Sequence, residues 1–365
     1  MRLVTLSCLL LFSIVAFAQP NQSCIRSLDS LFTATFKTGE PGGSVLIAKD
    51  GQVFYKKGFG LEDLNTKKPI TTESLFNVGS ISKTFVAFSI LRLADEGKLS
   101  LADDIYRYFP DFRSPEIAKK IKIVHLLTHS SGLPDNRKIT EDSIFFLTAK
   151  DEENFAPLKE TDSLHFEPGE RFEYSNPAFN ALALIIEKVT GKKWQDYVKE
   201  TIFKPSGMKR SDITDGPHPQ SGVSHGYLKI GDRFSEKDYG EEPTFAAAGN
   251  GGVWSSVEEL WKYEQAIQKN TFLKRDIIDT SRTIVSFSNW KDTLPPFIGL
   301  CWFITRQSDI RMIGHTGSQG GFRGDYQWLP DKNIFFVVLC NTPGPIDGLR
   351  EKSFAILQRF DWLNQ

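Results

Sequence analysis

The stretch from Ser80 to Gly97 is SISKTFVAFSILRLADEG. Its centre is apolar on most faces of a helix, so the sequence predicts a buried helix from Ile81 to Leu93, with Gly97 as its stop signal. At helical pitch, residues three apart share a face, which places Lys83 beside Ser80. The predicted apolar helix therefore begins with two polar groups that its pitch holds side by side.

Ser80 and Lys83 have the chemistry of an activated nucleophile. A serine hydroxyl is a poor nucleophile until a base removes its proton, and desolvation in an apolar helix disfavours the charged form of a lysine. The N-terminal end of the helix adds a partial positive charge beside the anion that develops during attack. The same pattern is also an ordinary helix start, and both interpretations stand at this point.

A second polar element is Tyr174-Ser175-Asn176. A tyrosine near the lysine can relay a proton to a leaving group, and the asparagine can hold the lysine or a substrate carbonyl. The alternative is a capping segment, because Ser175 or Asn176 followed by Pro177 starts a helix well. That helix is predicted from Ala178 to Lys188.

The third element is His315-Thr316-Gly317, which is followed by Ser318. A strand edge that ends in glycines lets a substrate backbone approach closely. A β-turn between two strands is the alternative interpretation of the same residues.

In this order, the three elements resemble the motifs of the penicillin-recognising serine hydrolases. The resemblance is to the branch that holds class C β-lactamases, soluble DD-carboxypeptidases, esterases and D-aminopeptidases. Three further segments resemble this family and extend the likeness over nearly the whole chain after residue 18. They are LLTHSSGLPD at 126–135, FEPG at 166–169 and GGVWSS at 251–256.

The resemblance implies a role for each matching residue. Ser80 is the expected acylated nucleophile, Lys83 the proton acceptor beside it, and Tyr174 the general acid/base. Asn176 is expected to contact Lys83 or the substrate amide. The expected substrate-binding residues of the third motif are His315, Thr316, Gly317 and Ser318. The backbone N–H groups of Ser80 and Ser318 are the expected oxyanion hole.

One residue departs from the β-lactamase pattern. His315 stands where β-lactamases usually have a lysine, and a histidine is largely neutral near pH 7. The resemblance therefore implies a hydrolase of small peptide, amide or ester bonds, similar to D-Ala-D-Ala carboxypeptidases, D-aminopeptidases or esterases. A true β-lactamase and a non-catalytic binding or assembly protein on the same fold are the alternatives.

Short β-rich runs at both ends of the chain predict the fold class. Residues 43–48 and 52–59 are joined by Asp50-Gly51, a strong hairpin signal. Further strands are expected at 297–305, 310–313, 325–329 and 334–339, and flanking helices at 23–36, 257–269 and 346–363. We expect an α+β architecture, with one antiparallel sheet built from N- and C-terminal segments, flanked by helices. A mostly helical insertion is expected at about 98–240.

Composition excludes several classes of protein. The chain has 365 residues and 40% hydrophobic content, which excludes a disordered chain, a collagen-like repeat and a polytopic membrane protein. Lys and Arg number 44 against 45 Asp and Glu, so the charge argues against a nucleic-acid partner. His125 and His129 are four apart but lack the H-E-x-x-H pattern, so we expect both to be structural histidines. We expect no metal, no cofactor and a small-molecule or short-peptide substrate; the oligomeric state stays open.

Residues 1–18 have the pattern of a secretory signal peptide. Arg2 is the positive n-region, 3–17 is the apolar run, and Ala16-Phe17-Ala18 is an A-x-A cleavage site. We expect export to the periplasm or the extracellular space, with one hydrolase domain over 19–365. The run is short for a membrane span.

Three cysteines remain after the expected cleavage site: Cys24, Cys301 and Cys340. Three cannot all pair internally, and a domain of this size needs no disulfide scaffold. Cys301 and Cys340 lie in apolar runs, which favours buried thiols.

A second serine motif, Gly222-Val223-Ser224-His225-Gly226, matches the G-x-S-x-G pattern of another hydrolase fold. That pattern needs a strand before it and a helix after it. Proline and glycine precede it here and a strand-like run follows, so we expect a surface loop.

Overall fold

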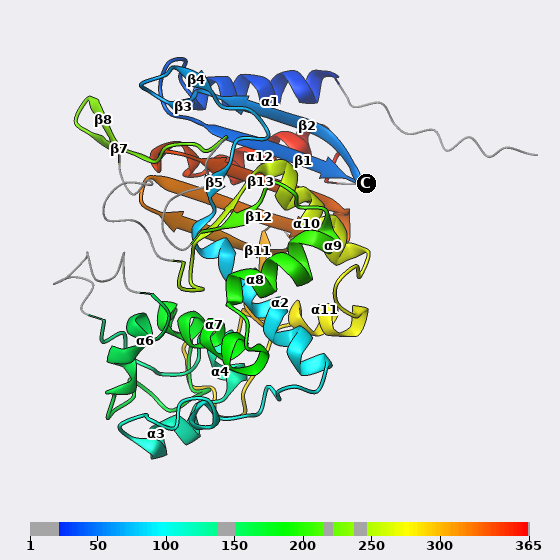
Figure 1. The fold of residues 1–365 in the computed structure, drawn as a ribbon. Helices are drawn as coiled ribbons and strands as arrows, with labels where there is room; N and C mark the ends of the chain where they lie inside the picture. Colours follow the sequence, from blue (N-terminus) through cyan, green and yellow to red (C-terminus); the bar gives the residue numbers. More distant parts are fainter. Residues whose placement is uncertain (1–21, 138–149, 215–221, 237–246, 308, 364–365) are drawn as a thin grey trace, which may run out of the picture.

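The computed structural model describes residues 22–137, 150–214, 222–236, 247–307 and 309–363 (Figure 1). The expected signal peptide lies outside these ranges, and its prediction stays open. The domain boundaries likewise stay a prediction.

The centre of the fold is a six-stranded sheet in the order β10-β11-β12-β13-β1-β2. Every neighbouring pair in it is antiparallel. Its strands are β1 (Gly43–Lys49), β2 (Gln52–Phe59), β10 (Phe303–Gln307), β11 (Ile310–Gln319), β12 (Phe322–Leu329) and β13 (Ile334–Cys340). The N-terminal strand β1 pairs directly with the C-terminal strand β13, which confirms the predicted α+β architecture.

The β1–β2 hairpin forms where its turn residues predict it. Asp50 has φ 50° and Gly51 has φ 79°, and two positive φ values in succession are the signature of a two-residue turn that matches strand twist. On its other side, β1 pairs with β13 from Gly43 opposite Cys340 to Lys49 opposite Ile334.

The sheet is covered on both faces, and its central strand shows this in its sequence. All seven residues of β13 are buried. Alternate side chains of a strand point to opposite faces. Phe335, Val337 and Leu339 belong to one apolar cluster, and Phe336 and Val338 belong to the other.

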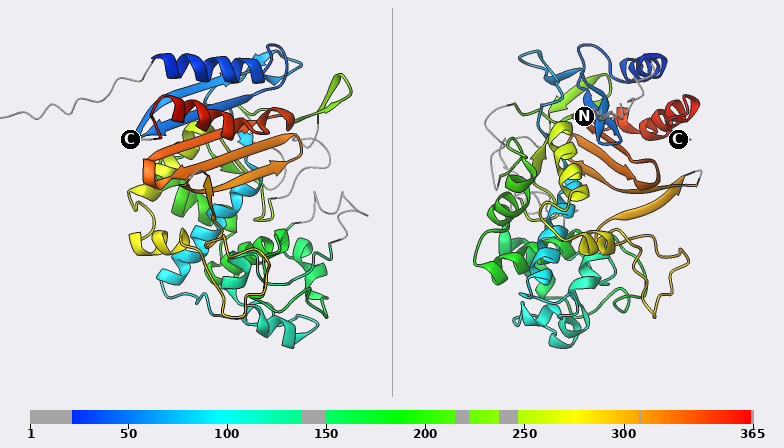
Figure 2. Two further views of the ribbon diagram at one scale, coloured as in Figure 1. Left: turned by 180° about the vertical axis from the view of Figure 1, so that it is seen from behind. Right: turned by 90° about the vertical axis from the view of Figure 1, so that its right-hand side faces the viewer.

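The second cluster lies between the sheet and two terminal helices, α1 (Gln22–Thr35) and α12 (Leu349–Arg359), which cover one face side by side (Figure 2). Cys24, Leu28 and Phe32 are four residues apart and form the buried stripe of α1. The stripe explains why this helix packs on the sheet.

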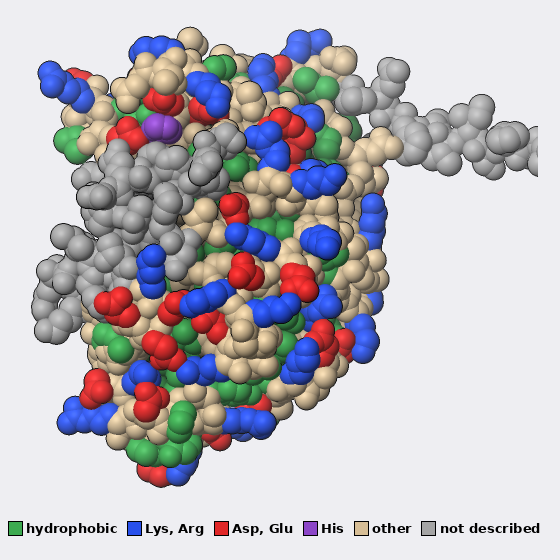
Figure 3. All heavy atoms as spheres, viewed as in Figure 1, with side chains coloured by type: hydrophobic (Ala, Val, Ile, Leu, Met, Phe, Trp, Pro, Cys, Tyr) green, Lys and Arg blue, Asp and Glu red, His purple; other side chains and the backbone are tan. Residues whose placement is uncertain are grey.

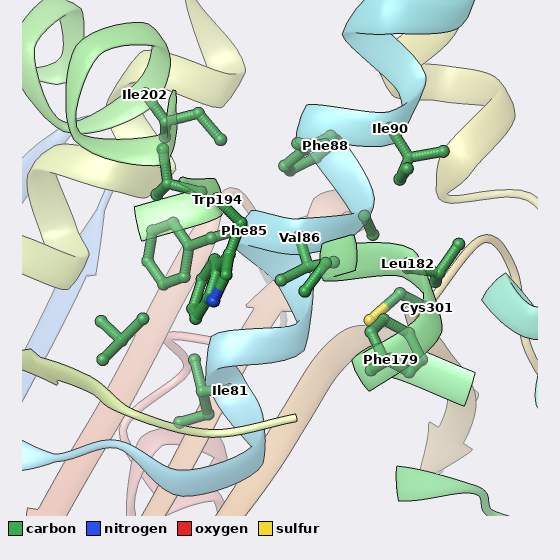
Figure 4. Packing of buried hydrophobic residues seen from close by; sticks show 14 of the residues in the cluster. Ile81, Phe85, Val86, Phe88, Ile90, Phe179, Leu182, Trp194, Ile202 and Cys301 are labelled. Carbon is green, nitrogen blue, oxygen red and sulfur yellow. The ribbon is translucent and has the colours of Figure 1, made fainter. Parts of the chain in front are cut away.

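The first and larger cluster joins the other face of the sheet to the helical half of the molecule. Its helices are α2 (Ser82–Asp95), α3 (Pro115–Lys120), α4 (Ile123–Leu127), α6 (Asp151–Lys159), α7 (Asn176–Thr190), α8 (Trp194–Val198), α9 (Lys204–Ser206), α10 (Val257–Gln268) and α11 (Arg275–Ser281). Helix α2 runs through this half and is surrounded by apolar side chains such as Phe85 and Phe88 (Figure 4). Residues 82–91 of α2 are all buried, as its sequence predicts.

Small sheets complete the fold. They consist of β3 (Leu61–Asp63) with β4 (Lys68–Pro69), of β5 (Phe76–Asn77), β9 (Val253–Ser255) and β6 (Asp212–Ile213), and of β7 (Tyr227–Ile230) with β8 (Arg233–Glu236). The β7–β8 hairpin projects from the body of the molecule (Figure 1).

One strand is shorter than we expected. Residues 297–302, predicted as the start of a strand, precede β10, which begins at Phe303. Cys301 has φ 77°, outside the extended region. Its N–H donates to the carbonyl of Leu127 at the end of α4 rather than to a strand. Tertiary contact with a helix therefore overrides the apolar strand pattern there.

Acidic and basic side chains are interspersed on the face of the molecule drawn in Figure 3. Among the described helices, none is long and apolar enough to cross a membrane.

A buried ion pair ties α10 to the segment after α11. Glu264 is fully buried, and Arg282 donates to its two carboxylate oxygens at 2.9 and 2.7 Å. The hydroxyl of Tyr326 in β12 donates to the same carboxylate. Tyr326 lies opposite His315 in the sheet, so this network supports the strand that carries the third motif.

We predict that Arg282→Met lowers the free energy of unfolding by about 3–5 kcal/mol, because Glu264 is left with an uncompensated buried charge. The matched control is Arg275→Met, whose pair with Asp279 is exposed and is worth at most about 1 kcal/mol. Urea denaturation measures both. Equal losses of unfolding free energy in the two variants would contradict the claim that Arg282 compensates the buried charge of Glu264.

Candidate active site

Ser80 and Lys83 meet as their spacing predicts. Ser80 lies in a short 3-10 turn, η1 (Gly79–Ile81), directly before α2, and Lys83 lies in the first turn of α2. The amine Nζ of Lys83 is 3.0 Å from Ser80 Oγ and 2.7 Å from the carbonyl oxygen of Asn250. The amine is thus held between the hydroxyl and a main-chain acceptor.

Burial changes the protonation of Lys83. The residue is 0% exposed. Its amine lies 5.0 Å from the centre of the Tyr174 ring and 5.7 Å from that of Phe179. Desolvation, with a smaller contribution from the positive charge of Arg137, lowers the pKa of Lys83 to about 7. Near neutral pH a substantial share of the amine is therefore uncharged and able to accept a proton.

Tyr174 lies next to both groups. It precedes α7 and is 39% exposed. Desolvation nevertheless raises the pKa of Tyr174 above its usual value, and a side-chain hydrogen bond with Ser80 partly opposes the rise. The phenol therefore stays protonated at neutral pH, which suits a proton donor.

The position of Tyr174 depends on His129, a residue we predicted only as structural. The two rings are stacked, with centroids 4.3 Å apart. The N–H of Ser175 donates to Nδ1 of His129 at 3.0 Å, and the N–H of Glu173 donates to the His129 carbonyl at 2.8 Å. Contacts on both sides of Tyr174 therefore fix the segment to His129, which has φ 52°.

The protonation state of His129 follows from these contacts. Because Nδ1 accepts a hydrogen bond, the proton of the neutral ring is on Nε2. Burial and the charge of Lys83 keep the pKa of His129 well below its usual range. His125, four residues earlier, instead accepts from the N–H of Lys122 at the start of α4. The two rings have separate partners, which agrees with structural histidines.

Two glycines bring β11 against the turn that holds Ser80. A Cβ atom at Gly317 would lie 2.0 Å from the carbonyl oxygen of Val78 and 3.3 Å from the backbone nitrogen of Ser80. A Cβ atom at Gly79, where φ is +52°, would lie 2.6 Å from the backbone nitrogen of Ser318. Any larger residue would separate the two backbone nitrogens expected to form the oxyanion hole.

Asn250 is a site residue that sequence reasoning missed. Its carbonyl accepts from Lys83, and the loop before β9 is closely packed on its neighbours. A Cβ at Gly249 would be 2.5 Å from Cβ of Ala183 in α7. With its amide in the orientation that satisfies its neighbours, Asn180 donates to Oδ1 of Asn250 at 3.0 Å. The run of glycines around Asn250 was the available signal.

The remaining predicted residues differ in how they face the site. Asn176 begins α7, and its half-buried side chain follows the N-cap Ser175, whose hydroxyl accepts from Ala178 N–H. The hydrogen bonds of Lys83 to described residues go to Ser80 and Asn250. Thr316 and Ser318 are exposed and alternate along β11 with the buried His315 and Gly317. The main chain of β11 at Gly317 and Ser318 lies against η1.

His315 is 2% exposed and lies beside Phe303, with ring centroids 5.1 Å apart, and Tyr174, at 6.3 Å. Its Nδ1 is 2.6 Å from the carbonyl oxygen of Thr316. Burial and the charge of Lys83 lower the pKa of His315 to about 3, so the ring is neutral at physiological pH. It does not supply the cation that a lysine would supply.

The cysteines are buried free thiols, as predicted for Cys301 and Cys340. Burial raises the pKa of Cys24 to about 11 and the pKa of both other thiols further. Cys301 lies beside Phe179 in the core (Figure 4), close enough to Lys83 to act on its titration. A neutral thiol there keeps the surroundings of the lysine apolar.

The G-x-S-x-G segment is buried rather than on the surface, which corrects our expectation. Ser224 is 0% exposed, and its N–H donates to the carbonyl of Leu75 at 2.8 Å. The strand β7 follows it, so the strand-turn-helix of a nucleophile elbow does not form.

Sequence comparison identifies the family that the three motifs resemble. The family profile described as Beta-lactamase matches residues 27–359. The chain is 29% identical over 321 residues to Penicillin-binding protein 4* of Bacillus subtilis (strain 168), covering 83% of this chain and 68% of that protein. It is 32% identical over 323 residues to Protein flp of Staphylococcus aureus (strain MRSA252), covering 87% of this chain and 62% of that protein. The chain thus spans about two thirds of the length of these curated relatives.

Solved structures share the fold. The octameric penicillin-binding protein homologue from Pyrococcus abyssi superimposes with a TM-score of 0.78 at 28% identity, covering 93% of this chain and 77% of that chain. The D-amino acid amidase from Ochrobactrum anthropi SV3, complexed with L-phenylalanine amide, gives a TM-score of 0.76 at 21% identity. The superposition covers 94% of this chain and 99% of that chain. At this lower identity the likeness shows the fold alone.

We predict that Gly317→Ala slows acylation by a small activated ester about 10²–10³-fold, the usual effect of losing one oxyanion donor. The added methyl group would push η1 away from β11. Stopped-flow measurement of the acylation rate checks this. Gly344→Ala is the control, because a Cβ there meets nothing within 4 Å. An unchanged rate in Gly317→Ala would refute the assigned oxyanion hole.

Proposed function

The chain belongs to the Beta-lactamase family, and from that premise we propose that it is a serine hydrolase acting through an acyl-enzyme on Ser80. The observation that carries the proposal is the 3.0 Å contact between Ser80 Oγ and the amine of fully buried Lys83. A base of pKa about 7 beside a serine hydroxyl is the arrangement that nucleophilic catalysis requires.

In the acylation step, Ser80 Oγ attacks the substrate carbonyl carbon and its proton passes to the neutral amine of Lys83. The carbonyl oxygen becomes an oxyanion between the backbone N–H groups of Ser80 and Ser318. The close approach of β11 to η1 supports this placement.

Collapse of the tetrahedral intermediate breaks the bond to the leaving group. The protonated phenol of Tyr174 gives its proton to the departing nitrogen or oxygen, and Lys83 returns a proton to Tyr174. The proton that left Ser80 thus reaches the leaving group through two residues. The stacked His129 holds the tyrosine ring in place during the transfer.

Water completes the cycle by attacking the acyl carbon. Its proton passes to the neutral amine of Lys83, and the bond to Ser80 Oγ breaks as that oxygen takes the proton back. The products are a free acid and the regenerated hydroxyl. No cofactor takes part in the proposed cycle.

The proposed substrates are small peptides, amides or esters. The neutral ring of His315 removes the fixed cation that a lysine would offer to a substrate carboxylate. For that reason we favour aminopeptidase, amidase or esterase activity over β-lactamase activity. Carboxypeptidase activity, whose substrate also ends in a carboxylate, is the alternative within the proposed range. A D-amino acid amidase on the same fold fits this range.

We also propose that the protein is exported, with cleavage after Ala18. The support is the charged, apolar and A-x-A pattern of residues 1–18. N-terminal sequencing of the protein from its native host tests this proposal, and a start at Met1 would contradict it.

We predict a transient mass increase equal to the acyl group after brief exposure of the protein to p-nitrophenyl acetate. The adduct should be absent in Ser80→Ala, because that variant lacks the nucleophile. Intact-mass spectrometry on quenched samples measures it.

The matched control for the acylation experiment is Ser224→Ala, which removes the other motif serine from a buried position. It should acylate as the wild type does. An adduct that persists in Ser80→Ala would show that another residue is the nucleophile. Absence of an adduct in the wild type would favour a binding or assembly role.

We predict that kcat/KM for a neutral ester rises about tenfold per pH unit below pH 7 and levels off above it. The uncharged amine of Lys83 is the active form, and burial lowers its pKa to about 7. His315 and His129, both with lowered pKa values, contribute no inflection between pH 6 and 9. A rise that continues beyond pH 9 would contradict the assignment of the base.

A further inference from the structure

The described part of the chain holds a cavity away from the catalytic residues. It lies between α10, α11 and one end of the β11–β12 pair. We propose that this cavity is a second binding site, which takes an organic carboxylate with an apolar body. The proposal does not depend on the proposed hydrolysis, because Ser80, Lys83 and Tyr174 are not among the residues that line the cavity.

The cavity lies at the opposite end of β11 from the expected oxyanion hole. Arg311 is in its wall, whereas Ser318 lies against η1. A strand rises about 3.4 Å per residue, so these two residues are on the order of 20 Å apart along β11. Beyond Ser318, Gly321 packs against Tyr227 of β7, and Figure 1 shows β7 and α11 on opposite sides of the molecule. A ligand in the cavity therefore does not cover Ser80.

The size and the walls of the cavity suit a small organic molecule. Its volume is about 580 Å³, within the range of ligand-binding pockets. Each of the four surrounding elements contributes one apolar side chain to the walls, namely Ile267, Ile278, Ile313 and Trp328. Such walls favour a ligand with an aromatic or aliphatic group, because that group leaves water when it binds.

The charged side chains of the cavity favour an anion. Three arginines line it, Arg275, Arg282 and Arg311, against one carboxylate, that of Asp279. Two of these arginines already have a carboxylate partner. Arg275 donates to Asp279 at 3.0 Å, and Arg282 donates to both oxygens of Glu264. The positive charge of Arg311 is therefore in excess in the cavity wall.

The surroundings of Arg311 show where the anion would bind. Its Nε is buried and has no hydrogen-bond partner among the described residues. Oδ1 of Asp331 lies 3.9 Å from this Nε, beyond hydrogen-bond distance. On β10, Arg306 lies directly opposite Arg311, and like charges at opposite positions of a sheet repel. A carboxylate, whose two oxygens match the guanidinium fork, would supply the missing partner and reduce this repulsion.

Two matched probes test the proposal: naphthoate, and naphthamide, which has the same rings without the charge. Calorimetry should show that the wild type binds naphthoate about tenfold or more tightly than naphthamide. Arg311→Gln should remove this difference and leave the naphthamide affinity unchanged. Arg311→Lys keeps the charge without the planar fork, so its naphthoate affinity should fall between the two. The matched control is Arg26→Gln, an exposed position on α1, across the sheet, which should bind as the wild type does.

NMR spectra of the protein with isotope-labelled tryptophan locate the bound probe. The indole N–H resonance of Trp328, assigned by its loss in Trp328→Phe, should shift when naphthoate binds, in the wild type and in Ser80→Ala alike. No binding of naphthoate, equal affinity for the two probes, an affinity that Arg311→Gln leaves unchanged, or shifts confined to other indoles would overturn the proposal. Absence of an ester adduct on Ser80, with this binding retained, would instead overturn the hydrolase mechanism alone.

Discussion

The arrangement of the site depends on burying the amine of Lys83 inside an apolar helix. An exposed lysine keeps its proton near pH 7 and cannot serve as a base. Helix α2 avoids this because its first three turns are buried on every side. The amine then has two oxygen partners, one from Ser80 at the helix start and one from the Asn250 loop. Desolvation lowers the pKa of this amine to about 7, and the two oxygen partners hold it beside the Ser80 hydroxyl.

The two halves of the fold contribute different parts of the chemistry. The helical half supplies Lys83 and, through His129, the orientation of Tyr174. The sheet supplies the edge of β11, which approaches η1 because Gly317 and Gly79 lack side chains. The nucleophile lies at the junction of the halves. Strands from both ends of the chain form one sheet, so the junction forms only when the whole domain has folded.

Much of this arrangement is predictable from the sequence because its signals are local. The helical spacing of Ser80 and Lys83, the Asp50-Gly51 hairpin and the apolar run of β13 each act over a few residues, and each appears as expected. The contacts that sequence reasoning missed are long-range. Asn250 reaches Lys83 across 167 positions. The turn at Cys301, with φ 77°, likewise depends on a contact with α4.

The most direct test of the account is the pKa of Lys83 itself, measured by NMR titration of the protein with isotope-labelled lysine side chains. The Lys83 resonance is assigned by its loss in Lys83→Met. The account predicts a midpoint near pH 7 for this one amine, well below the value of an exposed lysine. A midpoint near 10.5, the value for an unperturbed lysine, would contradict the claim that burial makes Lys83 the base for Ser80.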